Sequence, residues 1–355
     1  MLSTTREDEL LAVGWKPFFQ QQLLQLEEHL EPARVVVVQR NGLTIAPAVG
    51  QHTFVSVAGR YFIQDPLSRP TVGDWVAVDP STGSLVAVLE RTSLIKRLSP
   101  GNTGEIQLIA ANIDTAFLVT SCNADFNLAR LERYLSVILE AGIQPVVVLT
   151  KIDTVEAPET YIDEARRLGA DIPIEAVNAL DIDSLSGLAG WCGPGQSIAL
   201  LGSSGVGKST LVNSLAGNTL QATQAIREED DKGRHTTTHR SLHKLPMGGV
   251  ILDSPGMREF QLADAEQGVE SVFADIETLA EQCKFNDCQH HSEPGCAVQQ
   301  AIADGVLEPR RLDSYFKLQR EDQFNRETLA ERHTRYRQFS KKVKSATQSA
   351  DKKRR

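Results

Sequence analysis

One segment of the sequence has the residue types and spacing that bind phosphate. Residues 202–209 read Gly-Ser-Ser-Gly-Val-Gly-Lys-Ser, between an apolar run and a run that favours helix. Glycines let backbone N–H groups surround phosphate oxygens, and the positive end of the following helix adds attraction. A coincidental glycine turn is the weaker interpretation, because pattern and context agree. The candidate phosphate-binding residues are Gly202, Ser203, Ser204, Gly205, Val206, Gly207, Lys208, Ser209 and Thr210.

A second segment has the pattern of a base-recognition loop. Thr150-Lys151-Ile152-Asp153 follows the apolar run 145–149. Asp153 could accept hydrogen bonds from N1–H and N2–H₂ of guanine, a donor pair that adenine lacks, and Lys151 could lay its stem along the base. Thr150 stands where many GTPases have asparagine. Residues 178–180 could add backbone support to the base. We therefore predict a guanine-nucleotide site.

Further residues could complete the phosphate chemistry. Lys208 would reach the β- and γ-phosphates, and Ser209 would bind Mg²⁺. Asp253, at the end of an apolar run and followed by Ser-Pro-Gly, could hold the Mg²⁺ shell. Met257 stands where small GTPases carry a water-orienting glutamine, and an apolar side chain cannot orient water. We therefore expect slow intrinsic hydrolysis or a substitute group.

The candidate substitute is His235, in the loop Gly-Arg-His-Thr-Thr-Thr-His at 233–239. An exposed loop histidine without a role explains this residue type equally well. A threonine of the same loop could complete the Mg²⁺ shell when the γ-phosphate is present, and the sequence leaves open which one. The candidate catalytic residues are thus Lys208, Ser209, His235 and Asp253.

The order of these segments is unusual. The base loop lies about fifty residues before the phosphate loop, whereas ordinary GTP-binding domains run in the opposite order. The same site would therefore be built from a circularly permuted chain.

A third cluster suits a metal. Cys283, Cys288, His290 and Cys296 lie within fourteen residues and offer three thiolates and one imidazole. Such a set favours one structural, tetrahedral Zn²⁺ ion. His291 is a rival ligand, since neighbouring histidines cannot be ranked by spacing. A redox site is less favoured because the sequence has no Cys-x-x-Cys pair, and reduced, unliganded cysteines are the remaining alternative.

Composition limits the class of protein. The chain has 355 residues, of which 41% are hydrophobic and 23% charged, as in globular proteins of more than one domain. Long apolar runs and a signal-type N-terminus are absent from the sequence, so we expect a cytoplasmic protein without a membrane span. The net charge is −9, yet residues 331–355 carry ten Lys or Arg against two acidic residues. This basic end is either a solvated tail or an RNA-phosphate contact.

The elements that position these residues change in character along the chain. Residues 7–30 are typical of one amphipathic helix, or of two short helices divided at Gly14 and Pro17. Strands at 35–38, 53–57, 75–78 and 85–89 predict a small β-barrel of the oligonucleotide-binding type. Strands at 113–120, 145–150, 172–177, 197–201 and 250–253 alternate with helices at 128–140, 158–168 and 208–216, which predicts a parallel sheet covered on both faces. Residues 262–355 favour helix.

Together these motifs resemble the ribosome small-subunit-dependent GTPase A family, over nearly the whole chain. The resemblance also rests on Gly73–Val76, Ala111–Asp114 and Asn123–Asn127. It implies a multidomain protein, with an N-terminal helical segment (1–33), an oligonucleotide-binding β-barrel (34–98), a circularly permuted α/β GTPase domain (99–261), a mainly helical zinc-binding domain (262–340) and a basic tail (341–355). Residues 14–19 depart from the arginine-rich N-terminus of many members, which indicates a divergent or second copy.

The resemblance implies a function as well. A monomer would bind GTP or GDP, with Mg²⁺, and would act on the 30S ribosomal subunit and its 16S rRNA in late maturation. GTP hydrolysis would be stimulated by the subunit. The segment Asp253–Gly256 has the position of the second switch of a GTPase and runs directly into the zinc domain. We therefore hypothesise that the GTP form binds the subunit and that hydrolysis triggers release. The rival hypotheses are a P-loop ATPase or small-molecule kinase, and a zinc-containing RNA-binding adaptor with a slow or structural nucleotide site.

Overall fold

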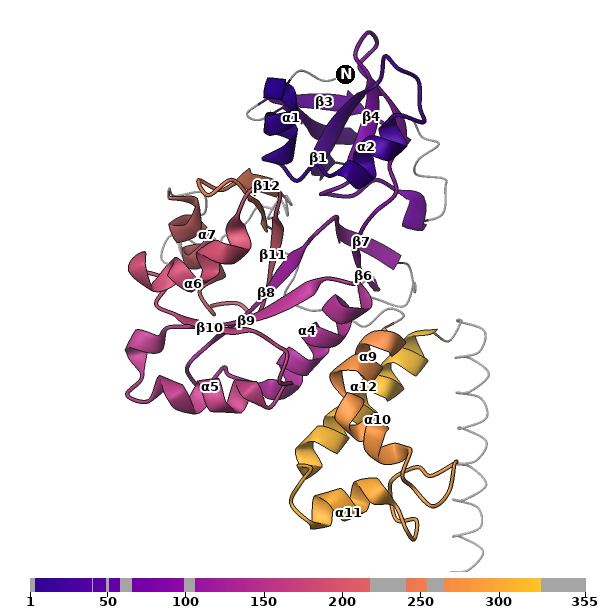
Figure 1. Ribbon diagram of the computed structural model, residues 1–355, viewed down its shortest axis with the longest axis vertical. Helices are drawn as coiled ribbons and strands as arrows, with labels where there is room; N and C mark the ends of the chain where they lie inside the picture. The colour runs from indigo at the N-terminus through magenta and orange to yellow at the C-terminus, as the bar shows by residue number, and fades with distance from the viewer. Residues whose placement is uncertain are drawn as a thin grey trace, which may run out of the picture.

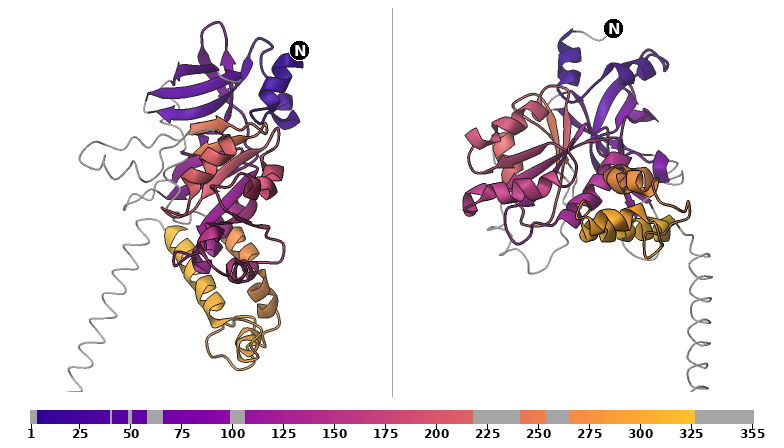
Figure 2. Two further views of the ribbon diagram at one scale, coloured as in Figure 1. Left: turned by 90° about the vertical axis from the view of Figure 1, so that its left-hand side faces the viewer. Right: turned by 60° about the horizontal axis from the view of Figure 1, so that its bottom comes forward.

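The computed structural model describes residues 4–39, 41–48, 51–57, 66–98, 106–217, 241–253 and 265–326. Three parts follow one another along the long axis of the molecule (Figure 1). A β-rich N-terminal part lies at one end, an α/β part in the middle and a helical C-terminal part at the other end. The view turned about the vertical axis shows the same sequence of parts (Figure 2, left).

The N-terminal part begins with two short helices, α1 (Thr4–Leu11) and α2 (Pro17–Leu23). The single long helix that the sequence also allowed does not form, because Gly14 has a φ of 92° and Pro17 starts the second helix. An antiparallel sheet of order β3-β2-β1-β4-β5 follows, and its edge strands β3 and β5 approach each other. Its strands are β1 (Glu31–Gln39), β2 (Gly42–Ala48), β3 (Gln51–Ser56), β4 (Trp75–Asp79) and β5 (Ser84–Val88).

A buried arginine joins this part to the α/β part. Arg34 donates from Nη2 to the carbonyl of Asn112 at 3.0 Å, from Nε to that of Gly73 at 3.3 Å, and from Nη1 to that of Val13. Its guanidinium also lies 5.6 Å from the ring centre of Trp75. Burial lowers the pKa of Arg34 to about 10, so it remains charged at neutral pH. One cation thus connects α1, the antiparallel sheet and the start of the α/β part.

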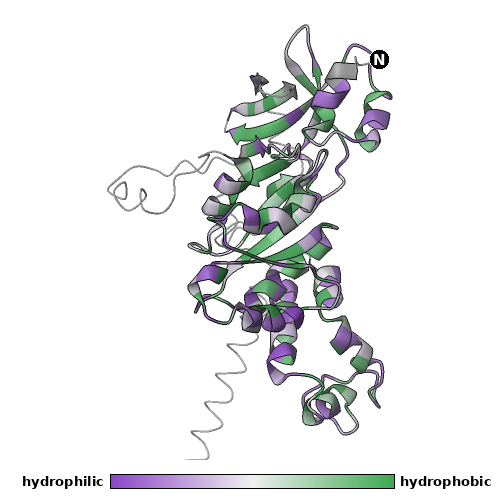
Figure 3. Cartoon of the chain, turned by 60° about the vertical axis from the view of Figure 1, so that its left-hand side comes forward, coloured by the Kyte–Doolittle hydropathy of each residue, from purple (hydrophilic) through white to green (hydrophobic). Residues whose placement is uncertain are grey.

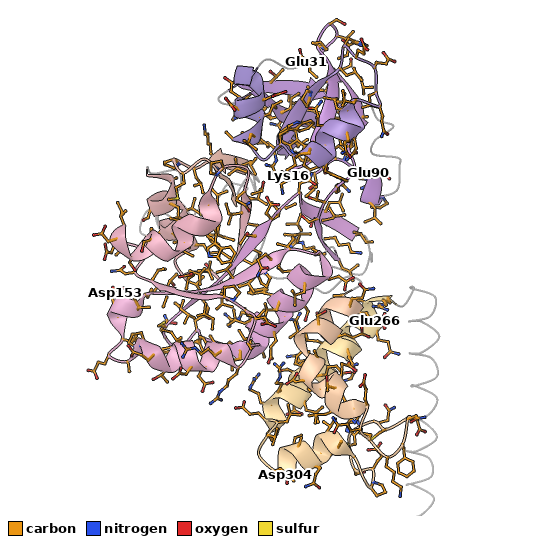
Figure 4. The ribbon with its side chains drawn as sticks, viewed as in Figure 1. Lys16, Glu31, Glu90, Asp153, Glu266 and Asp304 are labelled. Carbon is orange, nitrogen blue, oxygen red and sulfur yellow. The ribbon has the colours of Figure 1, made fainter. Side chains whose placement is uncertain are left out.

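Residues 14–19, the segment that departs from the expected N-terminus, lie at this junction. Trp15 packs edge-on against Trp75 with ring centres 4.6 Å apart, and Phe19 packs on the same ring. Lys16 forms an ion pair with Asp114, just before the central sheet, and lies between the two parts (Figure 4). The segment therefore holds the two parts in a fixed relation.

The α/β part contains a six-stranded sheet of order β10-β9-β8-β11-β13-β12. Every neighbouring pair is parallel except β12 and β13. The strands are β8 (Thr115–Ser121), β9 (Gln144–Thr150), β10 (Ile174–Val177), β11 (Ser197–Leu201), β12 (Ser241–Lys244) and β13 (Val250–Asp253). A ribbon of β6 (Leu94–Leu98) and β7 (Ile106–Ala111) leads into it. The sequence did not predict β2, β6, β7 or β12.

Both faces of the sheet are buried, as its continuous apolar strands predict. On β8, Phe117 and Val119 contribute to one core, while Ala116 and Leu118 contribute to the other. Hydropathy colouring shows this apolar sheet through the middle of the molecule (Figure 3). The covering helices are α4 (Leu128–Glu140), α5 (Pro158–Arg166), α6 (Ser186–Ala189) and α7 (Lys208–Ala216). The carboxyl ends of parallel strands meet at one edge, so the loops after β8, β9 and β11 converge there, and β13 ends at the same edge.

The C-terminal part is helical, as predicted, and packs on α4. It contains α9 (Glu266–Val272), α10 (Ala274–Ala280), α11 (Ala297–Ala303) and α12 (Pro309–Arg326). The carboxylate of Glu132 on α4 is fully buried and accepts hydrogen bonds from Arg310 at 3.1 Å and from Arg311 at 3.2 Å. Arg311 also donates to Asp275 at 2.6 Å. A buried charge is tolerated only when it is paired, so this network fixes α12 against α4.

A close helix crossing completes this contact and gives a testable prediction. A Cβ atom added to Gly268 on α9 would lie 1.9 Å from the carbonyl oxygen of Ser136 on α4. We expect Gly268→Val to destabilise the protein by about 1–3 kcal/mol, because the helices must separate to admit the side chain. Urea unfolding would measure the loss. Gly190→Ala is the control, since a Cβ atom there meets open space. Equal losses in the two variants would contradict this packing argument.

Candidate nucleotide and metal sites

The predicted phosphate loop joins β11 to α7 at the converging edge of the sheet. A Cβ atom on Gly202 would lie 2.2 Å from the carbonyl oxygen of Val119 on β8, so only glycine fits there. Gly207 has a φ of 94° immediately before α7 begins at Lys208. Val206 is buried in the core and anchors the loop. The backbone therefore has the strand, loop and helix arrangement that cradles phosphate.

Lys208 is held over this loop by backbone carbonyls. Its ammonium donates to the carbonyl of Gly202 at 2.7 Å and to that of Ser203. The Lys208 side chain therefore points back toward the phosphate loop, which immediately precedes α7. This is the position from which an ammonium can contact phosphate oxygens.

The predicted base loop lies against the phosphate loop. The Thr150 hydroxyl is buried and lies 2.6 Å from the carbonyl of Val206 and 3.2 Å from that of Thr120. A hydroxyl has one proton, so the shorter contact is the stronger hydrogen bond. Lys151 has a φ of 60° and donates to the carbonyl of Gly205 at 2.8 Å. Thr150 thus fastens one loop to the other.

The contact of Thr150 predicts a measurable defect. Thr150→Val removes the hydroxyl with little change in volume and leaves the buried carbonyl of Val206 without its donor. We expect nucleotide affinity to fall about tenfold, or about 1.4 kcal/mol. Fluorescent GDP titration measures this affinity. Thr278→Val is the control, because the Thr278 hydroxyl also donates to a carbonyl, that of Ala274, but on the distant α10. Unchanged affinity in Thr150→Val would remove the residue from the site.

The remaining base-site residues lie beside this contact. Ile152 and Asp153 belong to a short 3-10 turn, Ile152–Thr154, and Asp153 is exposed at the outer edge of the α/β part (Figure 4). The loop after β10 is tied to α7, because Ser214 donates to the carbonyl of Ala179 at 2.6 Å. Asn178 accepts from the backbone of Leu180 at 3.0 Å. The loops after β9, β10 and β11 are thus connected to one another beside α7.

Two residues at the phosphate loop were not predicted as site residues. Arg130 on α4 donates to the Ser203 hydroxyl and, at 3.0 Å, to both oxygens of Asp125. Tyr134, one turn further along α4, also hydrogen-bonds Ser203, and burial raises the pKa of this tyrosine. The available signal was the spacing of four between Arg130 and Tyr134, which places both on one helix face.

The other predicted site residues belong to the end of β13 and to segments that follow α7 and β13. Asp253 is the last residue of β13, at the same edge of the sheet. His235, the threonines beside it and residues 254–257 lie outside the described residues. So do residues 327–355, which contain the basic tail.

The four predicted metal ligands come together at the far end of the C-terminal part. Their ligand atoms all lie within 4.8 Å of one another, and they are Cys283, Cys288, His290 and Cys296. His290 Nδ1 lies 3.6 Å from the sulfur of Cys283 and 3.5 Å from that of Cys296, and these sulfurs are 3.9 Å apart. Tetrahedral zinc with Zn–S bonds of about 2.3 Å requires sulfurs about 3.8 Å apart. The cluster therefore can hold a metal ion.

The surrounding backbone explains why His290 and not His291 turns inward. His290 has a φ of 58°, and Gln299 donates to its carbonyl at 2.6 Å. The ring of His291 instead packs on Phe316, with ring centres 5.0 Å apart. Backbone N–H groups of Ala297 and Gln299 approach two of the sulfurs at 3.4 Å. Such donors stabilise thiolates.

The converging loops and their order define a class of protein. A phosphate loop on β11 and a base loop on the earlier strand β9 share one edge of a mainly parallel sheet, which describes a circularly permuted P-loop GTPase. A family model described as RsgA GTPase matches residues 88–263. This chain belongs to the RsgA GTPase family and is a GTP hydrolase. A model described as ABC transporter also matches residues 185–350, a range that includes the phosphate loop.

Curated relatives match almost the full length. The chain is 49% identical to "Small ribosomal subunit biogenesis GTPase RsgA 2" of Vibrio vulnificus, over 96% of this chain and 95% of the relative. It is 47% identical to "Small ribosomal subunit biogenesis GTPase RsgA" of Mesorhizobium japonicum, over 91% of this chain and 92% of the relative.

Solved structures support the fold. The chain is similar to YjeQ from Thermotoga maritima, with a TM-score of 0.58 and 24% identity over 82% of this chain and 98% of that one. It is equally similar to YloQ, a circularly permuted GTPase, with a TM-score of 0.58 and 24% identity over 85% of this chain and 98% of that one. Within the described ranges, no helix has the length and apolar character that crossing a membrane requires.

Proposed function

We propose that this GTPase acts in the biogenesis of the small ribosomal subunit. It binds the 30S subunit in late maturation, and the subunit stimulates hydrolysis of GTP to GDP and phosphate. The observation that carries this proposal is near-full-length identity of 49% and 47% to relatives named for that process. A protein with this role works in the cytoplasm, and we propose that it does so as a monomer in contact with 16S rRNA.

Within the nucleotide site, we propose the following roles for the residues predicted from the sequence. Residues 202–210 surround the phosphates, with Lys208 on the β- and γ-phosphates and Ser209 on Mg²⁺. Thr150, Lys151, Ile152 and Asp153 form the base site. Asp253, at the end of β13, supports the Mg²⁺ shell, and His235 remains the proposed water-orienting residue. Support comes from the parallel strands β9, β11 and β13, whose carboxyl ends lie at one edge of the sheet.

In the C-terminal part, we propose one structural Zn²⁺ ion held by Cys283, Cys288, His290 and Cys296. The sulfur and nitrogen separations of 3.5–3.9 Å support this assignment. Three thiolates and an imidazole leave no open position on a tetrahedral ion, so the role is to hold the fold of this part.

The decisive experiment measures GTP turnover with and without purified 30S subunits. We expect turnover to be slow alone and to rise strongly at saturating subunit concentration. The same subunits should bind the protein more tightly with a non-hydrolysable GTP analogue than with GDP, because only a difference in affinity lets hydrolysis cause release. Negligible turnover at saturating subunit would instead favour an RNA-binding adaptor with a structural nucleotide site.

Base selectivity gives a separate prediction. Asp153→Asn removes the carboxylate proposed to accept two hydrogen bonds from guanine. We expect GTP affinity to fall about 100-fold or more, with a gain for xanthosine triphosphate, because the amide can donate to the xanthine oxygen. Competition against fluorescent GDP measures both affinities. Asp163→Asn on α5 is the matched control, since that carboxylate is exposed and pairs with Arg166. Unchanged selectivity would favour a kinase or ATPase.

A further inference from the structure

Helix α4 lies between the phosphate loop and the helical C-terminal part, and it contacts both (Figure 1). We propose that α4 couples nucleotide state to the C-terminal part, with Arg130 as the positioning residue at the nucleotide end. The proposal rests on the nucleotide site assigned above. It provides a connection between the nucleotide site and the C-terminal part that is distinct from the second switch.

At the nucleotide end, Arg130 is shared between two partners. Its guanidinium contacts the Ser203 hydroxyl in the phosphate loop and both carboxylate oxygens of Asp125, and its side chain is 35% exposed. An arginine in this position has donors available to phosphate oxygens, which form stronger hydrogen bonds with it than a hydroxyl does. The number of nucleotide phosphates therefore alters how Arg130 divides its hydrogen bonds. Arg130 would therefore interact differently with GTP and with GDP. A nucleotide can change the conformation of the protein only through such a difference in interaction.

At the other end, the neighbouring residues of α4 hold the C-terminal part. Arg133 forms a two-point ion pair with Glu321 on α12, at 2.6 and 2.5 Å, and both side chains are less than a quarter exposed. Glu132 binds Arg310 and Arg311 at the start of the same helix. Arg130 and Arg133 are one turn apart on α4. A shift of this turn of α4 therefore moves the contact of Arg130 with the phosphate loop and the contact of Arg133 with α12 together.

Because α4 and α9 cross closely, α4 can shift only from one packed arrangement to another. Gly268 packs directly against the carbonyl of Ser136, and its backbone N–H donates to Glu140 at 2.8 Å. Asp322 on α12 accepts from the backbone of Ala265 at 2.8 Å, immediately before α9. Closely packed interfaces change between separate arrangements and do not deform smoothly. Movement of α4 would therefore carry α9 and α12 with it.

The test is a double-mutant cycle in the full-length protein with its metal bound. The variants are Arg130→Ala, Glu321→Gln and the two combined, and the quantity is the ratio of affinities for a non-hydrolysable GTP analogue and for GDP. We expect Glu321→Gln, which is remote from the loop, to change this ratio about threefold or more. When Arg130→Ala is already present, adding Glu321→Gln should not change this ratio further. Arg166→Gln is the control, since Arg166 is exposed on α5 and pairs with Asp163 on the same helix.

Hydrogen exchange provides a second readout that a purely structural role would not affect. Amides of α9 and α12 in the wild-type protein should differ in protection between the two nucleotides, and Arg130→Ala should abolish that difference. An unchanged ratio in Glu321→Gln, or additive effects of the two substitutions, would overturn the coupling. If the wild-type protein bound neither nucleotide, the nucleotide site itself would be wrong.

Discussion

Replacing His290 with alanine is expected to prevent metal binding at the proposed zinc site and to unfold the C-terminal part. His290 Nδ1 lies within 3.6 Å of two cluster sulfurs, and three thiolates alone bind a divalent ion far less tightly. Structural zinc in small domains contributes about 10–16 kcal/mol of apparent folding free energy, so losing it removes most of the stability of such a region. Metal analysis of the purified protein and thermal unfolding followed by circular dichroism would measure the effects.

The neighbouring histidine is a matched control for this experiment. His291→Ala removes the same side chain one residue away, where the ring packs on Phe316 and lies outside the ligand set. It should retain one equivalent of metal and lose at most the ring contact. Equal metal content in the two variants would contradict the assignment of His290. Treatment of the wild-type protein with a chelator should reproduce the His290→Ala unfolding profile.

The second large effect concerns catalysis. Lys208→Ala is expected to lower GTP turnover about 10²–10³-fold, the usual cost of losing one donor to charge that develops in a transition state. The ammonium lies over the phosphate loop, beside the carbonyls of Gly202 and Ser203, and alanine leaves that position without charge. Turnover is measured by phosphate release, with and without 30S subunits.

Arg166→Ala controls for loss of a positive charge on the same α/β part. Its side chain is 68% exposed on α5 and forms an ion pair with Asp163, one turn earlier on the same helix. This variant should retain wild-type turnover. Lys208→Ala with normal turnover would show that the phosphate loop does not carry the hydrolysis.

The fold could be predicted best where a strong pattern and a local signal agree. The helix expected at 128–140 has these bounds in α4, because Asn127 caps it through the backbone of Arg130 and an apolar stripe runs along it. The strands β8, β9, β11 and β13 were also expected, since runs buried on both faces are apolar throughout. The strand β12 was missed because four residues give too little alternation to distinguish a strand from a turn.

The metal cluster and the two nucleotide loops could be predicted for a related reason. Their chemistry is local, with ligands or glycines a few residues apart, so spacing alone limits what they can bind. His290 and His291 show the limit of this argument. Spacing could not choose between them, and the choice followed from the backbone conformation and from the packing of His291 on Phe316.

The sequence by itself determined the composition of each site and the reversed order of the nucleotide loops, since motif types and their order are properties of the chain. Only the tertiary structure decided which distant residues share a contact. Thr150 meets Val206 across 56 residues, Arg130 meets Ser203 across 73, and Glu132 meets Arg310 across 178. Such pairs depend on how whole helices and strands pack, and packing selects partners by shape and buried charge, which periodicity along the chain does not record.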